Sequence, residues 1–417
     1  MQASHGQEGN RARRNRPLVR FLKVTHAPGG RSTADGAIRR TAEHGITIML
    51  VTRVGVCVAL GLTLYAPSPG FARPGEGVTD AVSVRATGAF TRYVLPRDPD
   101  DPFDRPDALT IGNDGVVWVS EETTSPSSSV DRSTYWIARL DRSGTLKHFR
   151  VRGNIPPFPP GWPTSGPDGA LWFTAGAGVQ RMSTNGVFTA FPFPARQVRA
   201  GRPVSGPDGA LWFTAEADGA QGIGRVTTSG ASTFYRARTP CRLGSLASGP
   251  DGALWFTESF CDSPMEFSAR VGRMTTSGAF REYRAPRLAG LNGWVLGIAV
   301  GSDGALWLAG DGAAVYRFAL SGAVTAYRIP SGYSPKEIVA GSDGALWFTE
   351  SYTVGHALRS RLGRISTSGV ITEFSVTSDR GIYGLVADRR GGIWFIEGAP
   401  INTVVRASIG KLTSKGG

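Results

Sequence analysis

The sequence predicts an all-β protein that folds as a seven-bladed β-propeller with four antiparallel strands in each blade. One phrase occurs seven times: a Gly-containing turn, a Trp-centred strand, a strand ending in a basic residue, a second turn, and a strand ending in an aromatic residue. Repeats of this length are typical of units that stack or surround an axis. The last repeat ends near Lys411 without its fourth strand, whereas residues 88–93 have the fourth-strand pattern with no repeat before them. The N-terminal strand is therefore expected to complete blade seven and close the ring, which protects edges that an open array would expose.

The first two strands of each repeat are joined by a turn such as Pro250-Asp251-Gly252. Asp-Gly suits a tight hairpin because Gly adopts a positive φ without a steric penalty. The strand after the turn reads Leu-Trp-Phe-Thr in several repeats, and aromatic and β-branched residues favour strands. A Trp at one fixed strand position predicts packing between blades rather than a platform for sugar rings. For blades one to seven the tryptophans are Trp118, Trp172, Trp212, Trp255, Trp307, Trp347 and Trp394.

The third strand of each repeat ends in a basic residue flanked by apolar residues. One cation per repeat at a fixed position predicts a structural role, bonded to nearby turn carbonyls or acids, rather than a track for phosphates. The formal charge of +13 agrees, because residues 1–72 hold ten Lys/Arg and three Asp/Glu, a net +7 that leaves +6 for the rest. We therefore expect no nucleic-acid partner. The basic residues are Arg139, Arg181, Arg225, Arg273, Arg317, Arg364 and Lys411.

Four segments are expected along the chain. Residues 49–72 resemble a secretory signal: Met49 and Arg53 give a short basic start, residues 54–66 are an apolar run too short to span a bilayer, and Ala72 ends a breaker segment. Residues 1–48 are then a disordered basic leader or an overextended start, 73–80 a linker, and 81–417 the propeller. A twin-arginine leader and a retained membrane anchor are the alternatives to a cleaved signal. The sequence thus predicts a secreted, periplasmic or cell-envelope monomer without a stable membrane span after cleavage.

Two positions vary at the mouth of the propeller, which is the end of each inner hairpin opposite the Asp-Gly turn. Antiparallel register is expected to set the two positions of a blade opposite each other. Seven residues after the centre of the turn lie Glu121, Ala175, Ala215, Glu258, Gly310, Glu350 and Glu397. Seven residues before it lie Asp107, Gly161, Gly201, Gly244, Leu296, Lys336 and Tyr383. The four glutamates coincide with the longer segments, of 14–18 residues, that lead to the basic residue of the third strand. Function on repeat scaffolds usually sits on such loops.

Blades six, seven and one become neighbours when the ring closes. One side of the mouth is then expected to hold Lys336, Glu350, Tyr383, Glu397, Asp107 and Glu121, with His356 on the blade-six loop. Three interpretations stay open: a hydrated acidic rim, a carboxylate cage for a divalent cation, and an acid/base cluster. A cation or a raised pKa would relieve the repulsion between the acids.

Two cysteines remain beyond the predicted signal. Cys241 lies three residues before Gly244 and Cys261 lies three after Glu258, so the expected register sets the two cysteines face to face. In an exported protein this arrangement predicts a disulfide that braces the mouth of blade four.

Residues 249–258, Gly-Pro-Asp-Gly-Ala-Leu-Trp-Phe-Thr-Glu, and 362–365, Leu-Gly-Arg-Ile, resemble the virginiamycin B lyase, or streptogramin lyase, family. The resemblance covers about residues 81–417. It implies a seven-bladed propeller that confers antibiotic resistance by linearising streptogramin B antibiotics through elimination, with a magnesium ion. In that family the last blade carries Glu-Pro-His-Gly-Ile before the turn and a Glu that ends the Trp strand. The His acts as base, the Glu helps to bind the metal, and the preceding blade carries another Pro-His.

Transferred residue by residue, this pattern matches the present chain at Glu397. Tyr383 holds the last-blade His position, Gly381 the upstream Glu position, and Lys336 the preceding-blade His position. Removing a proton beside an ester carbonyl suits a base that titrates near neutrality, whereas Lys and Tyr ordinarily titrate near ~10. We therefore expect Lys336 to act as a cationic stabiliser and Tyr383 as a hydrogen-bond donor.

The catalytic candidates are Lys336, Tyr383 and Glu397; the ligand-binding candidates are Asp107, Glu121, Glu350 and His356; the candidates for binding Mg²⁺ are Glu397 and Glu121. The predicted function is an exported lyase-like propeller that binds a peptide-like or other small ligand at the mouth, with carbon–oxygen lyase activity left open. The alternatives are a non-catalytic propeller that binds an envelope protein or a glycan, and a lactonase-type metal-dependent hydrolase.

Overall fold

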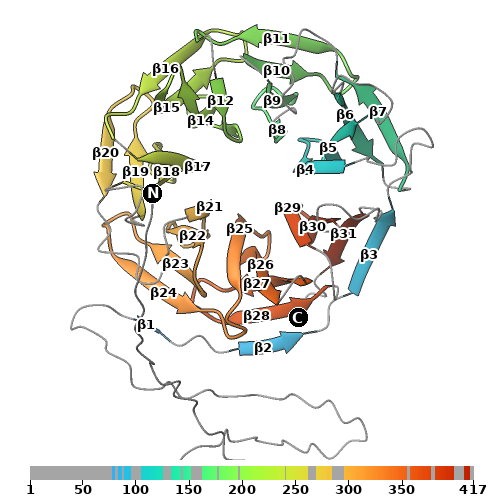
Figure 1. Cartoon of the computed structure of the whole chain (residues 1–417), viewed down its shortest axis with the longest axis vertical. Helices are drawn as coiled ribbons and strands as arrows, with labels where there is room; N and C mark the ends of the chain where they lie inside the picture. Colours follow the sequence, from blue (N-terminus) through green and yellow to red (C-terminus); the bar gives the residue numbers. More distant parts are fainter. Residues whose placement is uncertain are drawn as a thin grey trace, which may run out of the picture. The chain divides into compact units, whose positions relative to one another are not determined.

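The computed structural model describes residues 78–79, 83–86, 89–94, 105–124, 133–141, 144–151, 162–175, 178–195, 198–239, 241–261, 269–283, 295–354, 357–376, 381–398 and 408–413. These residues belong to one compact unit, Gly45–Gly417. They form strands and turns that make seven sheets around a common centre (Figure 1). The predicted all-β, seven-bladed propeller is therefore confirmed. This part of the chain contains no helix long and apolar enough to cross a membrane. The predicted leader 1–48, the signal 49–72 and His356 lie outside the described residues.

Each blade runs from an inner strand near the centre to an outer strand at the rim (Figure 1). Blade one comprises β4 (Arg105–Ile111), β5 (Val117–Thr124), β6 (Ser133–Leu140) and β7 (Leu146–Arg150). Blade two comprises β8 (Thr164–Ser165), β9 (Leu171–Ala175), β10 (Gly178–Met182) and β11 (Phe188–Pro192). Blade three has a divided inner strand, β12 (Val198–Ala200) and β13 (Val204–Ser205), followed by β14 (Leu211–Ala217), β15 (Ala220–Val226) and β16 (Ser232–Arg236). Blade four comprises β17 (Arg242–Ser248), β18 (Leu254–Ser259), β19 (Ala269–Met274) and β20 (Phe280–Tyr283).

The second half of the ring repeats this plan. Blade five comprises β21 (Val295–Val300), β22 (Leu306–Gly310), β23 (Ala314–Phe318) and β24 (Val324–Arg328). Blade six comprises β25 (Ser334–Ala340), β26 (Leu346–Val354), β27 (Ala357–Ile365) and β28 (Ile371–Ser375). Blade seven comprises β29 (Gly381–Ala387), β30 (Gly392–Gly398), β31 (Ser408–Thr413) and, from the other end of the sequence, β3 (Ala89–Val94).

The ring closes at blade seven as the sequence predicts. Strand β3 pairs antiparallel with β31 along its whole length, from Ala89 opposite Thr413 to Val94 opposite Ser408. Two shorter strands precede it: β1 (Val78–Thr79) pairs parallel with β24, and β2 (Ser83–Ala86) pairs parallel with β28. These blue strands lie at the rim of blades five and six in Figure 1. Residues 78–79, expected to be linker, thus add a fifth strand to blade five.

In blades two to six the Asp of the Asp-Gly turn bonds both repeated side chains, the Trp and the basic residue. In blade four, Asp251 Oδ1 accepts the indole N–H of Trp255 at 3.0 Å, and Asp251 Oδ2 accepts Nε–H of Arg273 at 2.7 Å. Burial opposes ionisation of Asp251, but these hydrogen bonds outweigh it and hold its pKa below the usual value. The same ion pair recurs in every blade: Arg139–Asp114, Arg181–Asp168, Arg225–Asp208, Arg273–Asp251, Arg317–Asp303, Arg364–Asp343 and Lys411–Asp388. The predicted structural role of the basic residues, with acids as partners, is confirmed.

The tryptophans pack between blades, as expected. Trp212 of blade three is fully buried in a cluster that includes Leu254 and Phe256 of blade four. Its ring also stacks on Tyr235 of its own outer strand, with ring centroids 5.6 Å apart. Buried aromatic faces of this kind make up much of the stability of a propeller core.

The inner strands contain bulges that change the expected register at the mouth. In blades one, four, five, six and seven the pairing shifts by one residue part-way along the inner strand. Glu350 therefore lies opposite Pro335 rather than Lys336, and Glu397 lies opposite Ile382 rather than Tyr383. The expected opposition of the two variable positions is wrong, because a bulge sets two residues of one strand against one of its partner.

Candidate functional site

The four mouth glutamates are buried within their blades. The exposed fraction is 7% for Glu121, 0% for Glu258, 1% for Glu350 and 1% for Glu397. This burial contradicts the hydrated acidic rim, which needs carboxylates in water. Each glutamate instead interacts with a residue on the outer strand of its own blade.

In blades seven and one that outer-strand residue is basic. Glu397 Oε2 accepts a hydrogen bond from Arg92 Nε on β3 at 2.9 Å, and Arg92 also donates to the carbonyl of Val376 in blade six. Glu121 Oε2 lies 3.0 Å from Nε2 of His148 on β7. The two carboxylates expected to share a metal are therefore held by separate partners.

In blades four and six the outer-strand residue is another acid. Burial, followed by repulsion from Glu282, raises the pKa of Glu258 to about 7, although the nearby Arg270 opposes the change. Burial and then Glu373 raise the pKa of Glu350 well above its usual value. Ser331 donates a hydrogen bond to Glu350 Oε2 at 3.0 Å. In these two blades the buried mouth glutamates, Glu258 and Glu350, thus favour the protonated form.

A glycine on the third strand makes room for the buried carboxyl in blade six. A Cβ on Gly363 would overlap the ring of Phe348 and would lie 2.5 Å from Glu350 Oε1. The Leu-Gly-Arg-Ile phrase therefore has a packing reason, because the second residue must have no side chain.

The residues at the two positions that hold His in the resembling family are bonded to the protein itself. The ammonium of Lys336 forms an ion pair with the carboxylate of Asp311. The hydroxyl of Tyr383 donates to the carbonyl of Pro106 in blade one at 3.0 Å. Asp107, the neighbouring ligand candidate, lies in the bulge of β4. The structure thus places Lys336 and Tyr383 on adjacent inner strands, with different partners.

The residue after Lys336 joins blade six to blade seven. Glu337 accepts hydrogen bonds from the backbone N–H groups of Gly384 at 2.9 Å and Leu385 at 2.8 Å. Gly384 has a φ of 67°, a conformation that glycine adopts without strain. Burial raises the pKa of Glu337 above its usual value, while the two N–H groups and the charge of Arg202 oppose the rise.

Arg202 lies on the opposite side of the ring, between β12 and β13 of blade three, and its Cζ is 5.6 Å from the ring centroid of Trp162. Blades three and six are not neighbours, so the attraction between Arg202 and Glu337 acts across the centre of the ring. Arg202 and Glu337 each lie one residue after the position, seven residues before the centre of the turn, from which the site was predicted. A comparison of the residues six before the centre of each turn shows that only blades three and six carry a charge there. These residues are Ala108, Trp162, Arg202, Ser245, Gly297, Glu337 and Gly384.

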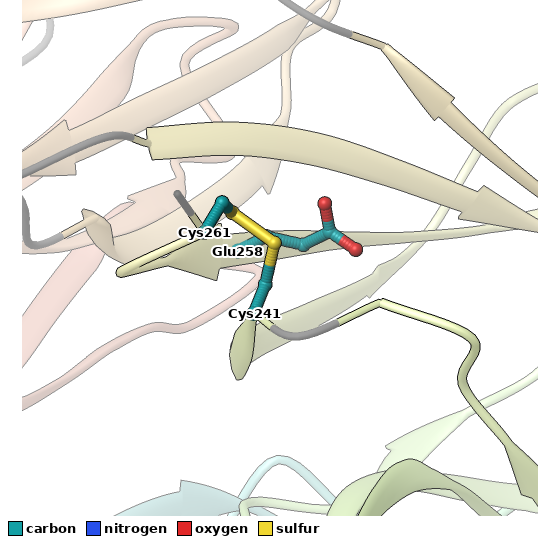
Figure 2. A group of neighbouring side chains, drawn as sticks. All are labelled: Cys241, Glu258 and Cys261. Atoms are coloured by element: carbon teal, nitrogen blue, oxygen red, sulfur yellow. A yellow bond between two sulfur atoms is a disulfide. The ribbon is translucent and has the colours of Figure 1, made fainter. Parts of the chain in front are cut away.

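Cys241 and Cys261 form a disulfide at the mouth of blade four, beside Glu258 (Figure 2). In the described residues these three side chains are the one group of His, Cys, Asp or Glu whose ligand atoms lie close enough to hold a metal. Sulfur atoms bonded to each other are not thiolates and do not bind a metal as thiolates do. The disulfide therefore makes this group a structural one.

The site expected for Mg²⁺ does not fit that ion. Mg²⁺ needs several oxygen ligands, and a positive charge beside those oxygens repels it. Glu397 already lies 2.9 Å from the guanidinium of Arg92, and Gly381 replaces the upstream acid. Glu121, the second predicted ligand, is bonded to His148.

Comparisons with known proteins agree with the geometry of the ring. A family model described as the virginiamycin B lyase family matches residues 83–287 and 206–417. A catalytically inactive virginiamycin B lyase from Staphylococcus aureus, solved with quinupristin, is 25% identical with a TM-score of 0.61, over 78% of this chain and 99% of that one. A streptogramin B lyase is 27% identical with a TM-score of 0.60, over 78% and 97%. The Pan2 WD40 domain of Neurospora crassa, 10% identical with a TM-score of 0.53 over 78% and 96%, shares the fold alone. No curated protein matches the chain significantly.

Proposed function

The chain belongs to the virginiamycin B lyase family, and from this premise we propose that it is an exported propeller that binds a peptide-like small ligand at the mouth without the family's elimination chemistry. The observation that carries this proposal is the state of the two positions that hold His in the family. Lys336 forms an ion pair with Asp311 and Tyr383 donates its hydroxyl to the Pro106 carbonyl, so neither position presents the imidazole that could act as a base near neutrality. The chain keeps the propeller of the family, but Lys336 and Tyr383 stand where the family has its two histidines.

Binding is supported by apolar side chains that solvent reaches at the mouth. Trp162 lies just before inner strand β8, and its side chain is 37% exposed. Leu296 lies on inner strand β21 and is 38% exposed. Tyr352, at the mouth end of β26, is also exposed and stacks on Tyr333 with centroids 5.3 Å apart. Exposed aromatic and aliphatic groups beside a few charged ones are typical of sites for small organic ligands.

Export is supported by the Cys241–Cys261 disulfide and by the predicted signal at residues 49–72. Disulfides form and persist in oxidising compartments, such as the cell exterior and the periplasm. We propose a secreted, periplasmic or envelope location and a monomeric protein.

A direct experiment tests binding and catalysis together. The protein is titrated with a type B streptogramin by calorimetry, and the same mixture is analysed by mass spectrometry with and without Mg²⁺. We expect binding without a ring-opened product. A product that disappears in Glu397→Ala would instead establish lyase activity, and the absence of binding by both the antibiotic and its ring-opened acid would contradict the peptide-like ligand.

A further inference from the structure

Arg202 differs from the repeated basic residues of the propeller because it contacts no acidic partner among the residues that the structure describes. The repeated basic residues each pair with the Asp of a turn, as Arg225 does with Asp208 in the same blade. The guanidinium of Arg202 stacks on the ring of Trp162. Among the described residues it donates no hydrogen bond. It is half-buried, and loss of hydration lowers its pKa from the usual value. A guanidinium in such a place lacks the acceptors that usually offset its desolvation.

Glu337 does not fill that role. Both of its carboxylate oxygens already accept backbone N–H groups, from Gly384 and Leu385, and it attracts Arg202 only through space. The N–H groups of the planar Arg202 guanidinium are therefore available to a ligand. Two of them point in parallel, as a fork that matches the two oxygens of a carboxylate. Trp162 fixes the plane of that fork from one side.

We infer that Arg202 binds the free carboxylate of a linear, peptide-like ligand at the centre of the ring. This inference rests on the proposed function and adds the class of ligand: an open-chain acid rather than a ring closed by an ester. An ester carbonyl carries no charge and leaves the guanidinium unpaired, whereas a carboxylate accepts two of its N–H groups. The exposed side chain of Trp162, which stacks on Arg202, supplies an apolar contact for the residue next to that carboxylate.

Two ligands of the same composition in amino acids test the inference. One is a cyclic type B streptogramin, and the other is its open acid, made by alkaline hydrolysis of the ester. Calorimetric titration of the full protein is expected to show the open acid binding about tenfold more tightly or better, as a charge-assisted pair of hydrogen bonds provides. Arg202→Gln should remove the preference, and Arg202→Lys, which keeps the charge but not the fork, should retain part of it.

Arg236→Gln serves as the matched control, because it removes the same charge from an exposed position on the outer strand of the same blade. It should leave the preference for the acid unchanged. Thermal unfolding of each variant verifies that the propeller remains folded. Equal binding of the two ligands, or a preference that survives Arg202→Gln, would overturn the inference and leave the proposed function standing. Binding of neither ligand would contradict the proposed function itself, and this inference with it.

Discussion

The carboxyl of Glu258 carries a proton under conditions in which an exposed Glu is ionised. It is fully buried, its two oxygens have no hydrogen-bond partner among the described residues, and Glu282 lies close enough to repel it. Arg270 pairs with Glu282 at 3.5 Å and only partly relieves this repulsion. Burial and the charge of Glu282 thus account for the raised pKa of this acid.

The protonation of Glu258 makes stability depend on pH. Its pKa is about 7 in the folded protein, against a usual value of 4.5 that applies to the unfolded chain. Below pH 4.5 both states hold the proton and the fold keeps its full stability; as the pH rises toward 7 the unfolded chain ionises first, so the free energy of unfolding falls.

Glu258→Gln removes this titration. We expect the variant to be more stable than the parent at pH 8, by up to ~3 kcal/mol, with no gain below pH 4.5. Urea unfolding across this pH range measures the difference. Glu216→Gln, on the equivalent strand of blade three and only half-buried, is the control that should show no such trend. A gain for Glu258→Gln that is constant with pH would contradict the prediction.

At the scale of the strand, the buried Glu350 depends on a glycine in the third strand of its blade. We expect Gly363→Ala to lower the free energy of unfolding by ~2 kcal/mol or more, because the new Cβ would overlap Phe348 and Glu350. Gly209→Ala is a useful comparison: its Cβ meets no atom within 4 Å, although its φ of 71° adds strain. Equal losses in the two variants would show that packing around Glu350 does not decide the residue at position 363.

The disulfide acts on the hairpin of blade four. Cys241 and Cys261 are 20 residues apart in the sequence, and a bridge of this length stabilises a protein by about 3 kcal/mol. We expect the double variant Cys241→Ser, Cys261→Ser to lose about this much stability in denaturant unfolding. The parent with reductant should unfold like the variant. Insensitivity of the parent to reductant, with both thiols free in peptide mapping, would refute the bridge.

At the scale of the whole molecule, the outer strand of blade seven comes from the start of the propeller segment. Residues of β3 complete a sheet whose other strands come from the C-terminal end, so one short pairing joins the two ends of the ring. Tyr93 of this strand stacks on Trp394 with centroids 5.6 Å apart. Loss of β3 would expose an edge of β31 and this tryptophan together.

Two truncations test the closure. Removal of residues 1–80 deletes β1 and is expected to leave cooperative thermal unfolding intact, because all strands of blade seven remain. Removal of residues 1–94 also deletes β2 and β3, and we expect cooperative unfolding to be lost and oligomers to form at the open edge. Circular dichroism and gel filtration compare the two proteins. A compact, cooperatively unfolding product of the longer deletion would show that closure is dispensable.

The repeat by itself predicted the number of blades, the strand order and the closure by residues 88–93, as well as the burial of the tryptophans. These features depend on local patterns, such as the Asp-Gly turn before Trp255, and seven copies of one pattern reinforce each other. The predicted partners of Arg273 and its equivalents follow for the same reason, since each ion pair lies within one blade.

Only the tertiary structure decided what lies at the mouth. A bulge changes the register without changing the pattern of apolar residues, so the sequence did not show that Glu397 lies opposite Ile382 rather than Tyr383. Nor does any local pattern show that Glu397 bonds to Arg92, or that Arg202 and Glu337 attract each other across the ring. These contacts join residues that are far apart in the chain and meet only when the blades close around their centre, which is why they require the folded molecule.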